Sequence, residues 1–298
     1  METVIDLWFV IIAFLWTGYF VLEGFDFGVG LLSPFVSADD GEHRQGLQTI
    51  GPVWDGNEVW LITAVGAMFA AFPAWYSGLF SAFYLPVVLI LVGLIVRGVG
   101  LEWRGKVSYP AWCDLGIVIG SALPAFLWGA VFANLLFGSA VAALVGGVFT
   151  LGLCVLHGAV FLALKTDGGV RRRSRLVALA ASAVVLPLAA VALSSLDSLP
   201  ALVAMGALAA AAALIWRRRE GWAFTATAAA IVLTSVSVFA DLRGAPLPGL
   251  TLAEAASGPY TLTMLSWIGL IALPFVLVYQ GWTYWVFRKR VRVAVAPR

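Results

Sequence analysis

Two acidic residues open a segment that is otherwise apolar enough to lie in a membrane. Asp55 and Glu58 lie three residues apart within residues 51–60 (GPVWDGNEVW), and an apolar run follows over residues 61–72. Residues three apart share one face of a helix, so both carboxyl groups point the same way. A charge at the bilayer centre costs roughly 2.5 to 3.5 kcal/mol. The pair is therefore a candidate functional site.

A second acidic pair precedes it in the chain. Glu23 and Asp26 are also three residues apart, next to and within the glycine-rich segment 24–30 (GFDFGVG), whose glycines favour close helix packing over phosphate binding. Counting 1.5 Å per residue, Asp26 is ~10 Å from the inner end of its helix and Asp55 ~5 Å from the start of the next. Because consecutive helices are antiparallel, we expect both pairs to occupy nearly the same layer.

One base and one further acid belong to this layer. Arg97 comes shortly before the inner end of a third apolar helix, and Asp114 begins a fourth helix from the same side. The expected layer contains five acids and one base: Glu23, Asp26, Asp55, Glu58, Asp114 and Arg97. A single arginine cannot neutralise five carboxyl groups, so such a set can hand protons inward from the cytoplasm.

The same residues have a purely structural interpretation. Asp55, Glu58 and Asp114 stand near helix N-termini, where a carboxylate can cap the helix and interact favourably with its dipole. Arg97 can extend its charged end to the membrane surface. Spacing and residue type leave both interpretations open.

Composition indicates the elements that must hold these residues. The chain of 298 residues is 62% hydrophobic and 11% charged, with a mean hydropathy of +0.97. That leaves too little polar surface to cover a soluble globule, so we expect an all-α, polytopic membrane protein. The two cysteines, Cys113 and Cys154, predict neither a disulfide framework nor a thiolate metal site. The net charge of +2 gives no sign of a nucleic-acid partner.

Apolar runs of about 20 residues predict nine transmembrane helices in one integral membrane domain, residues 1–298. Their expected ranges are 4–33, 52–72, 78–102, 113–137, 140–164, 175–194, 199–216, 222–240 and 261–287. Only the break at 194–200 separates the sixth helix from the seventh. If these two merge, the count falls to eight.

The distribution of basic residues supports nine helices. With the N-terminus outside and the chain alternating sides, every one of the 18 Lys and Arg residues except Arg243 falls on the inner side, Arg298 included. Merging two helices would place later basic clusters outside, against the positive-inside rule. We therefore predict an external N-terminus and a cytoplasmic C-terminus.

Metal and haem chemistry is not expected from this chain. Haem iron needs axial His, Met, Cys or Tyr ligands. The histidines are His43, in a predicted loop, and His157, alone on the fifth helix, where a hydrogen-bonded core histidine is favoured over a ligand or a proton relay. No zinc, nucleotide or Ser/His/Asp motif occurs.

Several motifs together resemble a known family. Residues 24–30, residues 54–64 (WDGNEVWLITA), Arg97 and residues 267–285 are similar to subunit II of the cytochrome bd quinol oxidases. The likeness is close over about the first 165 residues, fades across the Ala-rich middle and returns near the C-terminus.

The resemblance implies a haem-free subunit that pairs with a homologous subunit I, which carries haems b and d and the quinol site. The complex is expected to oxidise quinol, reduce dioxygen to water and take protons from the cytoplasm, in the cell membrane of a prokaryote. Small accessory subunits and membrane lipids are further candidate partners. A bound quinone or lipid is a candidate structural element of this chain.

The resemblance also implies roles for single residues. The family residue that matches Asp55 lies at the subunit interface on a proton path. This agrees with Glu58, Asp26 and Glu23 as further members of the path and with Arg97 as their charge partner.

Two tryptophans and one departure complete the comparison. Trp60 matches a tryptophan associated with an apolar oxygen route, and Trp54, beside Asp55, is a further candidate for the interface or this route. Glu58 stands where some members have a neutral amide, which sets its role apart from that of Asp55. The chain also lacks the sizeable polar loop that longer members have between the sixth and seventh helices.

Two other functions stay open. Buried acids and Gly/Pro-interrupted helices are also typical of a proton-coupled secondary transporter. A purely structural partner, whose acids only cap helices, is the third hypothesis. The oxidase hypothesis predicts that the chain co-purifies with a haem-bearing subunit, whereas a transporter would move a solute or ion by itself.

Overall fold

Helices make up nearly all of the structure. The computed structural model describes residues 2–196 and 198–292, which form twelve helices and no strand. Their bounds are α1 Glu2–Val36, α2 Asp40–Gln48, α3 Trp54–Ala71, α4 Pro73–Ala82, α5 Tyr84–Trp103, α6 Ala111–Phe137, α7 Ala140–Lys165, α8 Gly168–Ser194, α9 Leu199–Trp216, α10 Glu220–Leu242, α11 Leu252–Ala255 and α12 Pro259–Val286. The all-α class predicted from composition is confirmed.

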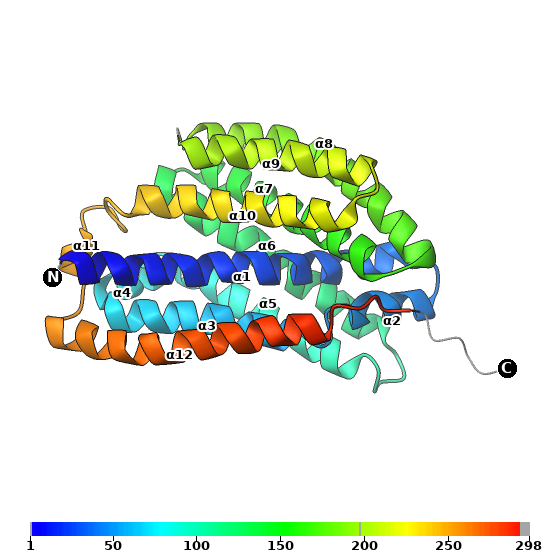
Figure 1. The fold of residues 1–298 in the computed structure, drawn as a ribbon, viewed down its shortest axis with the longest axis horizontal. Helices are drawn as coiled ribbons and strands as arrows, with labels where there is room; N and C mark the ends of the chain where they lie inside the picture. The colour runs from blue at the N-terminus through cyan, green and yellow to red at the C-terminus, as the bar shows by residue number, and fades with distance from the viewer. Residues whose placement is uncertain (1, 197, 293–298) are drawn as a thin grey trace.

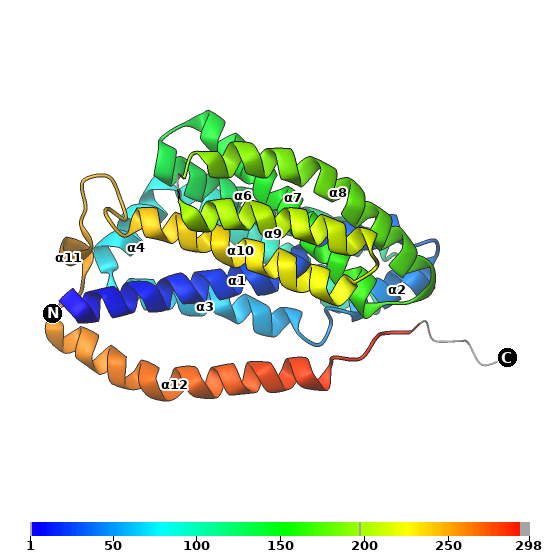
Figure 2. The same cartoon turned by 45° about the horizontal axis from the view of Figure 1, so that its top comes forward.

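The long helices run side by side along the long axis of the molecule (Figure 1). Helix α1 lies in the middle of the bundle, with α8 and α9 on one side and α3 and α12 on the other. Helix α12 packs mainly against α3 and α1 and stands apart from the rest in Figure 2. Since α1 begins and α12 ends at opposite ends of the bundle, the two terminal helices point in the same direction.

Eight helices are long and apolar enough to cross a membrane: α1, α5, α6, α7, α8, α9, α10 and α12. Helix α3 is not among them, because its first turns carry Asp55, Asn57 and Glu58. The count of nine spans therefore stays a prediction that depends on α3.

The sixth and seventh predicted helices are separate. Helix α8 ends at Ser194, and α9 begins at Leu199 after Ser198, whose hydroxyl accepts a hydrogen bond from the backbone N–H of Ala201. A hydroxyl in this position satisfies an N–H that has no partner within the helix. Asp197, in the predicted break, lies outside the described residues.

The third predicted helix is wrong in its extent. Residues 78–102 are not one helix, because α4 ends at Ala82 and α5 begins at Tyr84. Phe83 between them has φ −114° and ψ 33°, outside helical geometry. Pro86 explains the break, since proline suits the first turn of a helix and disrupts the hydrogen bonds of a helix interior.

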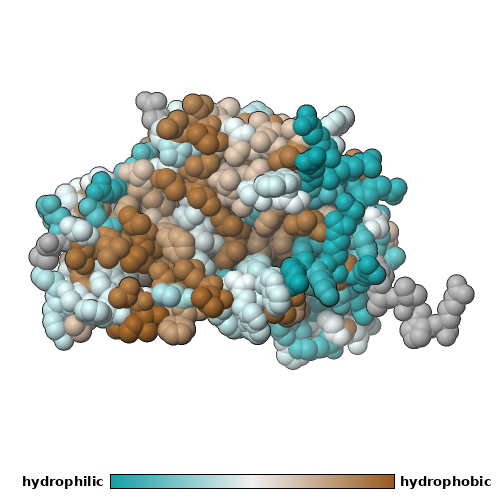
Figure 3. All heavy atoms as spheres, in the orientation of Figure 1, coloured by the Kyte–Doolittle hydropathy of each residue, from teal (hydrophilic) through white to brown (hydrophobic). Residues whose placement is uncertain are grey.

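Polar surface is concentrated at one end of the bundle. In Figure 3 the middle of the molecule is largely apolar, and the end at which α8 begins and α9 meets α10 is hydrophilic. We call it the basic end, because it carries Arg104, Lys165, Arg171 and the turn 217–219. Arg243 lies at the opposite end and pairs with Asp6 at 2.9 Å.

This separation of charge agrees with the positive-inside pattern. The direction of the chain across the membrane stays a prediction, and Arg298, which the pattern assigns to the inner side, lies outside the described residues.

Helices α1 and α7 cross at glycines. A Cβ added at Gly28 would lie 2.0 Å from the backbone oxygen of Cys154, and one at Gly158 would lie 2.4 Å from Gly28. Only glycine fits this crossing, which agrees with the close-packing interpretation of the segment 24–30. The contact holds Glu23 and Asp26, on the adjacent turns of α1, within the core.

Candidate functional site

Arg97 of α5 and Glu23 of α1 form an ion pair inside the bundle. Arg97 Nη1 donates a hydrogen bond to Glu23 Oε2 at 2.5 Å, Nη2 donates to Oε1 at 3.2 Å, and both side chains are 0% exposed. The two parallel bonds match the planar fork of a guanidinium to a carboxylate. Arg97 therefore does not extend to the membrane surface, which removes that part of the structural interpretation.

Two further groups contact the same guanidinium. Arg97 Nη2 lies 3.6 Å from Oε1 of Glu58, whose side chain is 22% exposed, and Cζ lies 4.9 Å from the centre of the Phe27 ring. Arg97 Nε has no hydrogen-bond partner among the residues that the structure describes. Helices α1, α3 and α5 thus bring together what we call the Arg97 cluster: Glu23, Glu58 and Arg97.

Asp26 belongs to a hydrogen-bond network that reaches α12. Asn57 Nδ2 donates to Asp26 Oδ2 at 2.7 Å, while Gln280 Nε2 and Tyr284 OH donate to Asn57 Oδ1 at 3.1 and 2.9 Å. The amide suits this position because it offers donors on one side and an acceptor on the other. Asp26 Oδ1 has no partner in the described part of the chain. We call these four residues the Asn57 network.

Sequence reasoning missed Asn57, Gln280 and Tyr284. Asn57 stands between Asp55 and Glu58 on the polar turn of α3, and that position was a usable signal. Gln280 is the one amide in the apolar α12. Neither residue type indicates its partner, so only the packing of α12 against α3 identifies the network.

Asp55 lies outside both groups. It is exposed on the first turn of α3, and it makes no hydrogen bond or ion pair with residues 2–196 or 198–292. Asp55 and Glu58 come from adjacent positions of one helix face, but only Glu58 reaches Arg97. Within the predicted layer, Glu23, Asp26 and Arg97 are therefore buried, whereas the carboxylate of Asp55 is exposed.

Trp60 and Trp54, the two candidate tryptophans, pack α3 against different helices. Trp60 is buried against α1: a Cβ added at Gly18 would lie 2.2 Å from its ring, and the Phe14 ring is 5.7 Å away at 60°. Trp54 is partly buried and faces α5, since a Cβ at Gly98 would lie 3.4 Å from its ring.

Asp114 does not join the predicted layer, which corrects that expectation. Arg104 Nε donates to Asp114 Oδ1 at 2.5 Å, and Arg104 Nη2 donates to Asp40 Oδ1 at 2.8 Å and lies 2.9 Å from His43 Nδ1. Asp114 is in the first turn of α6, at the basic end, and the short helix α2 brings Asp40 and His43 to it. We call these four residues the Arg104 cluster.

The Arg104 cluster borders a polar cavity of about 430 Å³ at the basic end. A hydrogen bond from Arg104 holds the pKa of Asp40 below its usual range. Burial, and then the charge of Arg104, lower the pKa of His43, while Asp114 and Asp40 oppose that shift. The neutral histidine can accept a hydrogen bond from Arg104 at Nδ1.

An apolar cavity of about 110 Å³ lies between α1, α6, α7, α8 and α10. Its walls include Phe27, Trp128, Phe132, Cys154 and Phe239. Since Phe27 also lies against Arg97, the cavity and the Arg97 cluster are separated by one aromatic ring.

His157 is positioned as a core residue. Its Nδ1 lies 2.7 Å from Thr227 Oγ1, its ring stacks on Phe224 at 4.6 Å, and the side chain is wholly buried. Packing on the ring face and the hydrogen bond to Thr227 do not fit an axial haem ligand. Within the described residues, no three His, Cys, Asp or Glu side chains come together as a metal ion would require.

Comparison with known proteins decides the family. The family model described as cytochrome bd terminal oxidase subunit II matches residues 4–287 of the chain. The chain belongs to this family. Cytochrome bd ubiquinol oxidase subunit 2 of Bacillus subtilis (strain 168) is 38% identical to it over 98% of each chain. Cytochrome bd-I ubiquinol oxidase subunit 2 of Escherichia coli (strain K12) is 30% identical, over 96% of this chain and 94% of its own length.

The fold agrees with that assignment. The solved structure of bd oxidase from Geobacillus thermodenitrificans contains a chain that superposes with a TM-score of 0.77, covering 96% of this chain and 100% of that one at 17% identity. As a cytochrome bd oxidase subunit II, the protein is a membrane protein and part of a quinol:oxygen oxidoreductase complex with a partner subunit I. The resemblance noted in the sequence is confirmed.

Proposed function

We propose that this subunit II holds no haem, supports a haem-bearing subunit I, and passes protons from the cytoplasmic side toward it. The observation that carries the proposal is an excess of acid within the bundle: Glu23 and Glu58 contact the single guanidinium of Arg97, and Asp26 is wholly buried one turn beyond Glu23. If every group were ionised, the set would carry net negative charge in an apolar setting, which is costly. Protons held by the set remove that cost, and carboxyl groups that exchange protons are what a transfer path requires.

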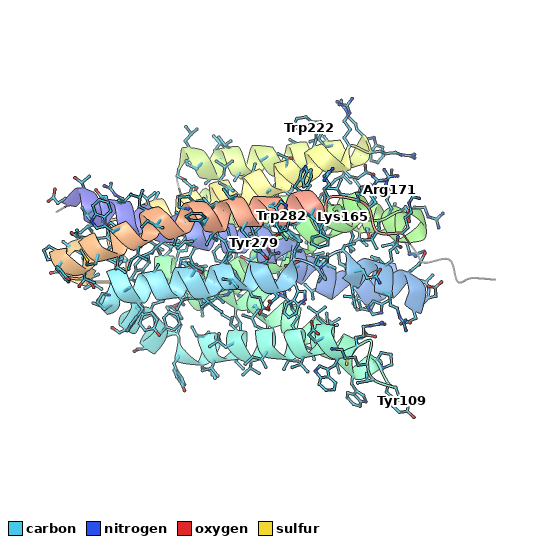
Figure 4. The ribbon with its side chains drawn as sticks, turned by 60° about the horizontal axis from the view of Figure 1, so that its bottom comes forward. Tyr109, Lys165, Arg171, Trp222, Tyr279 and Trp282 are labelled. Carbon is cyan, nitrogen blue, oxygen red and sulfur yellow. The ribbon has the colours of Figure 1, made fainter. Side chains whose placement is uncertain are left out.

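The exposed carboxylate of Asp55 is the proposed link between this set and the partner. A charged group at this depth is poorly suited to contact lipid, so we propose that subunit I covers it by packing on the exposed faces of α3 and α12. Helix α12 supports this choice, because Tyr279 and Trp282, labelled in Figure 4, are exposed on it. Aromatic side chains are enriched in the cores of protein interfaces.

Two finer roles belong to the same proposal. Trp60, packed on Gly18, borders a candidate apolar route for oxygen. The apolar cavity beside Phe27 and Trp128 is a candidate site for the chain of a structural quinone or lipid, because its lining offers almost no polar partner for a headgroup. We propose that haems b and d belong to subunit I, since His157 does not fit a ligand.

The substitution Asp55→Asn tests the proton role. The amide has nearly the shape of the carboxyl group but does not exchange a proton near neutral pH. We expect quinol oxidase turnover per haem to fall roughly a hundredfold, the low end of general acid–base contributions, while the haem spectrum of the purified complex is retained. Glu102→Gln is the matched control, because Glu102 is an exposed acid whose ion-pair partner is the exposed Lys106.

The outcomes separate the remaining hypotheses. Unchanged turnover per haem in Asp55→Asn would reject the proton role. A loss of haem content with turnover per haem intact would favour the purely structural partner. Membership of the family gives no support to the transporter alternative.

A further inference from the structure

Three consecutive arginines form the turn between α9 and α10. Arg217, Arg218 and Arg219 are all exposed, and we call them the arginine turn. Backbone hydrogen bonds close the end of α9, with the Arg218 N–H donating to Ile215 O at 3.0 Å and the Arg219 N–H to Leu214 O at 2.9 Å. The three guanidinium groups are thus presented from one short, ordered turn.

Arg218 keeps an unfavourable backbone conformation. Its φ of 58° is the one positive φ at a residue other than glycine among the described residues. The position that follows a helix end in this geometry normally takes glycine, because a Cβ there crowds the backbone. Backbone strain retained at a surface turn suggests that the side chain is needed for something other than folding.

Three other arginines at this end form ion pairs within the protein. Arg104 binds Asp114 and Asp40, Arg173 binds Glu42, and Arg171 binds Glu220 at 3.0 Å. In contrast, the side chains of the arginine turn make no hydrogen bond or ion pair with any residue of 2–196 or 198–292. Their charge is therefore available to a ligand.

The surroundings of the turn match a membrane surface. Trp216 precedes the arginines with 76% of its surface exposed, and Trp222 follows them with 66% exposed. Exposed tryptophans are enriched at the level of lipid headgroups. Figure 4 shows Trp222 and Arg171 toward the same end of the molecule, and Figure 3 shows apolar surface between this end and the other. Helix α9 itself is apolar throughout, so acyl chains can lie along it.

We propose that the arginine turn, flanked by Trp216 and Trp222, binds the phosphate groups of anionic phospholipids in the leaflet at the basic end. Guanidinium groups donate paired hydrogen bonds to phosphate oxygens, and basic residues near an anionic leaflet add attraction that falls off within a Debye length. The turn lies on the side of the bundle away from α12 (Figure 2), so a partner on α3 and α12 leaves it open to lipid. The inference does not depend on the proton role proposed for Asp55.

Retention of lipid by the purified complex tests this proposal. The complex is reconstituted in nanodiscs of mixed phosphatidylglycerol and phosphatidylcholine, extracted gently in detergent, and its bound lipid is quantified per haem by mass spectrometry. We expect wild type to retain phosphatidylglycerol selectively. In the variant R217Q/R218Q/R219Q, the selectivity for phosphatidylglycerol over phosphatidylcholine should fall at least fivefold, roughly the effect of one arginine near an anionic surface.

A matched control neutralises the same number of charges at the same end. In the variant R288Q/K289Q/R292Q the three residues follow α12, a helix that stands apart from α9 and α10 in Figure 2. This variant should retain phosphatidylglycerol like wild type. An equal loss in both variants, or no loss in R217Q/R218Q/R219Q, would overturn the proposal.

The substitution Arg218→Gly separates lipid binding from folding. Glycine removes the strained φ along with the guanidinium, so the complex should melt at a higher temperature in detergent while retaining less phosphatidylglycerol. If Arg218→Gly retains as much phosphatidylglycerol as wild type, the arginine turn is not the binding site.

Discussion

Two arginines at the same end of α5 are both buried but have partners that differ in exposure. Arg97 lies within the helix and Arg104 caps it, seven residues or ~10 Å further on. Each contacts two carboxylates from other helices. Arg97 and Glu23 are wholly buried, whereas the Asp40 side chain at Arg104 is 50% exposed.

The comparison teaches that burial, and not the number of ion pairs, decides what such a cluster does. Water and salt screen the Arg104 cluster, so its ion pairs contribute little to the stability of the packing between α2, α5 and α6. In the Arg97 cluster the Arg97–Glu23 pair is wholly buried, so each of these two charges depends on the other for its stabilisation. The predictions below test this difference.

The largest effect is expected from Arg97→Met. Removing the guanidinium leaves Glu23 buried without its partner, and breaking a buried pair costs about 3 to 5 kcal/mol. We expect the complex to accumulate poorly in the membrane, measured as haem-containing complex per milligram of membrane protein. The double variant Glu23→Met/Arg97→Met should recover accumulation, since a paired replacement by apolar groups is often tolerated. Equal loss in the single and double variants would contradict this account of the cluster.

A smaller effect is expected from Asn57→Leu. This change removes the shared partner of Asp26, Gln280 and Tyr284. Buried polar groups left without partners cost about 1 to 3 kcal/mol, and we expect a lower melting temperature of the complex in detergent. Tyr284→Phe removes one bond only and should cost about 0.6 kcal/mol, the average for side-chain hydrogen bonds in membranes. A larger drop for Tyr284→Phe than for Asn57→Leu would show that Asn57 is not the hub.

Arg104→Gln should destabilise the complex less than Arg97→Met or Asn57→Leu, by about 1 kcal/mol, because the partners of Arg104 are partly hydrated. The loss in melting temperature relative to wild type should shrink when the salt concentration rises from 0.05 to 0.5 M, roughly the range over which the Debye length falls by a factor of three. Arg97→Met should show no such salt dependence. If the decrease in melting temperature of Arg104→Gln does not depend on salt, the proposed difference between the two clusters is wrong.

The smallest effect is a dependence on pH through His43. The folded protein holds the pKa of His43 below its ordinary value of 6.5, with Asp40 on its own helix, Arg104 after α5 and Asp114 on α6 as the charged groups that face it. The unfolded chain therefore binds a proton first as pH falls, so this contribution to stability is complete above about pH 6.5 and is lost below it. Between pH 7 and 5, the melting temperature of wild type should fall more steeply than that of His43→Asn. Equal slopes would exclude His43 as the cause.

Part of this architecture was predictable from local rules. Apolar runs and the distribution of Lys and Arg predicted the long helices, and the spacing of Glu23 and Asp26 predicted that both face one side of α1. Helix α2 was missed, although Asp39 before it caps the backbone of Glu42 and acids fill its first turn. Its polar composition hides it from a search for apolar runs.

The pairing of charges was not predictable in the same way. Asp114 was assigned to the layer of Arg97 because both lie near the inner ends of their helices, but an offset of two turns along α5 gives it Arg104 instead. Depth along a helix sets which layer a residue can reach. The packing of neighbouring helices then sets which partner it meets.

Composition and periodicity by themselves indicated a bundle of membrane helices with acids and Arg97 near the ends of its spans, and they marked these residues as candidates because a charge in lipid is costly. Only the structure showed that Arg97 and Glu23 lie inside the bundle. Only the tertiary structure decided that Glu23 binds Arg97 and that Asn57 joins Asp26 to Gln280 and Tyr284, which lie 223 and 227 residues away from Asn57 in the chain. The sequence does not specify these pairs because a hydrogen-bond donor of a given type can bind any acceptor within reach. Which of them meet depends on helix crossings such as Gly28 on Gly158.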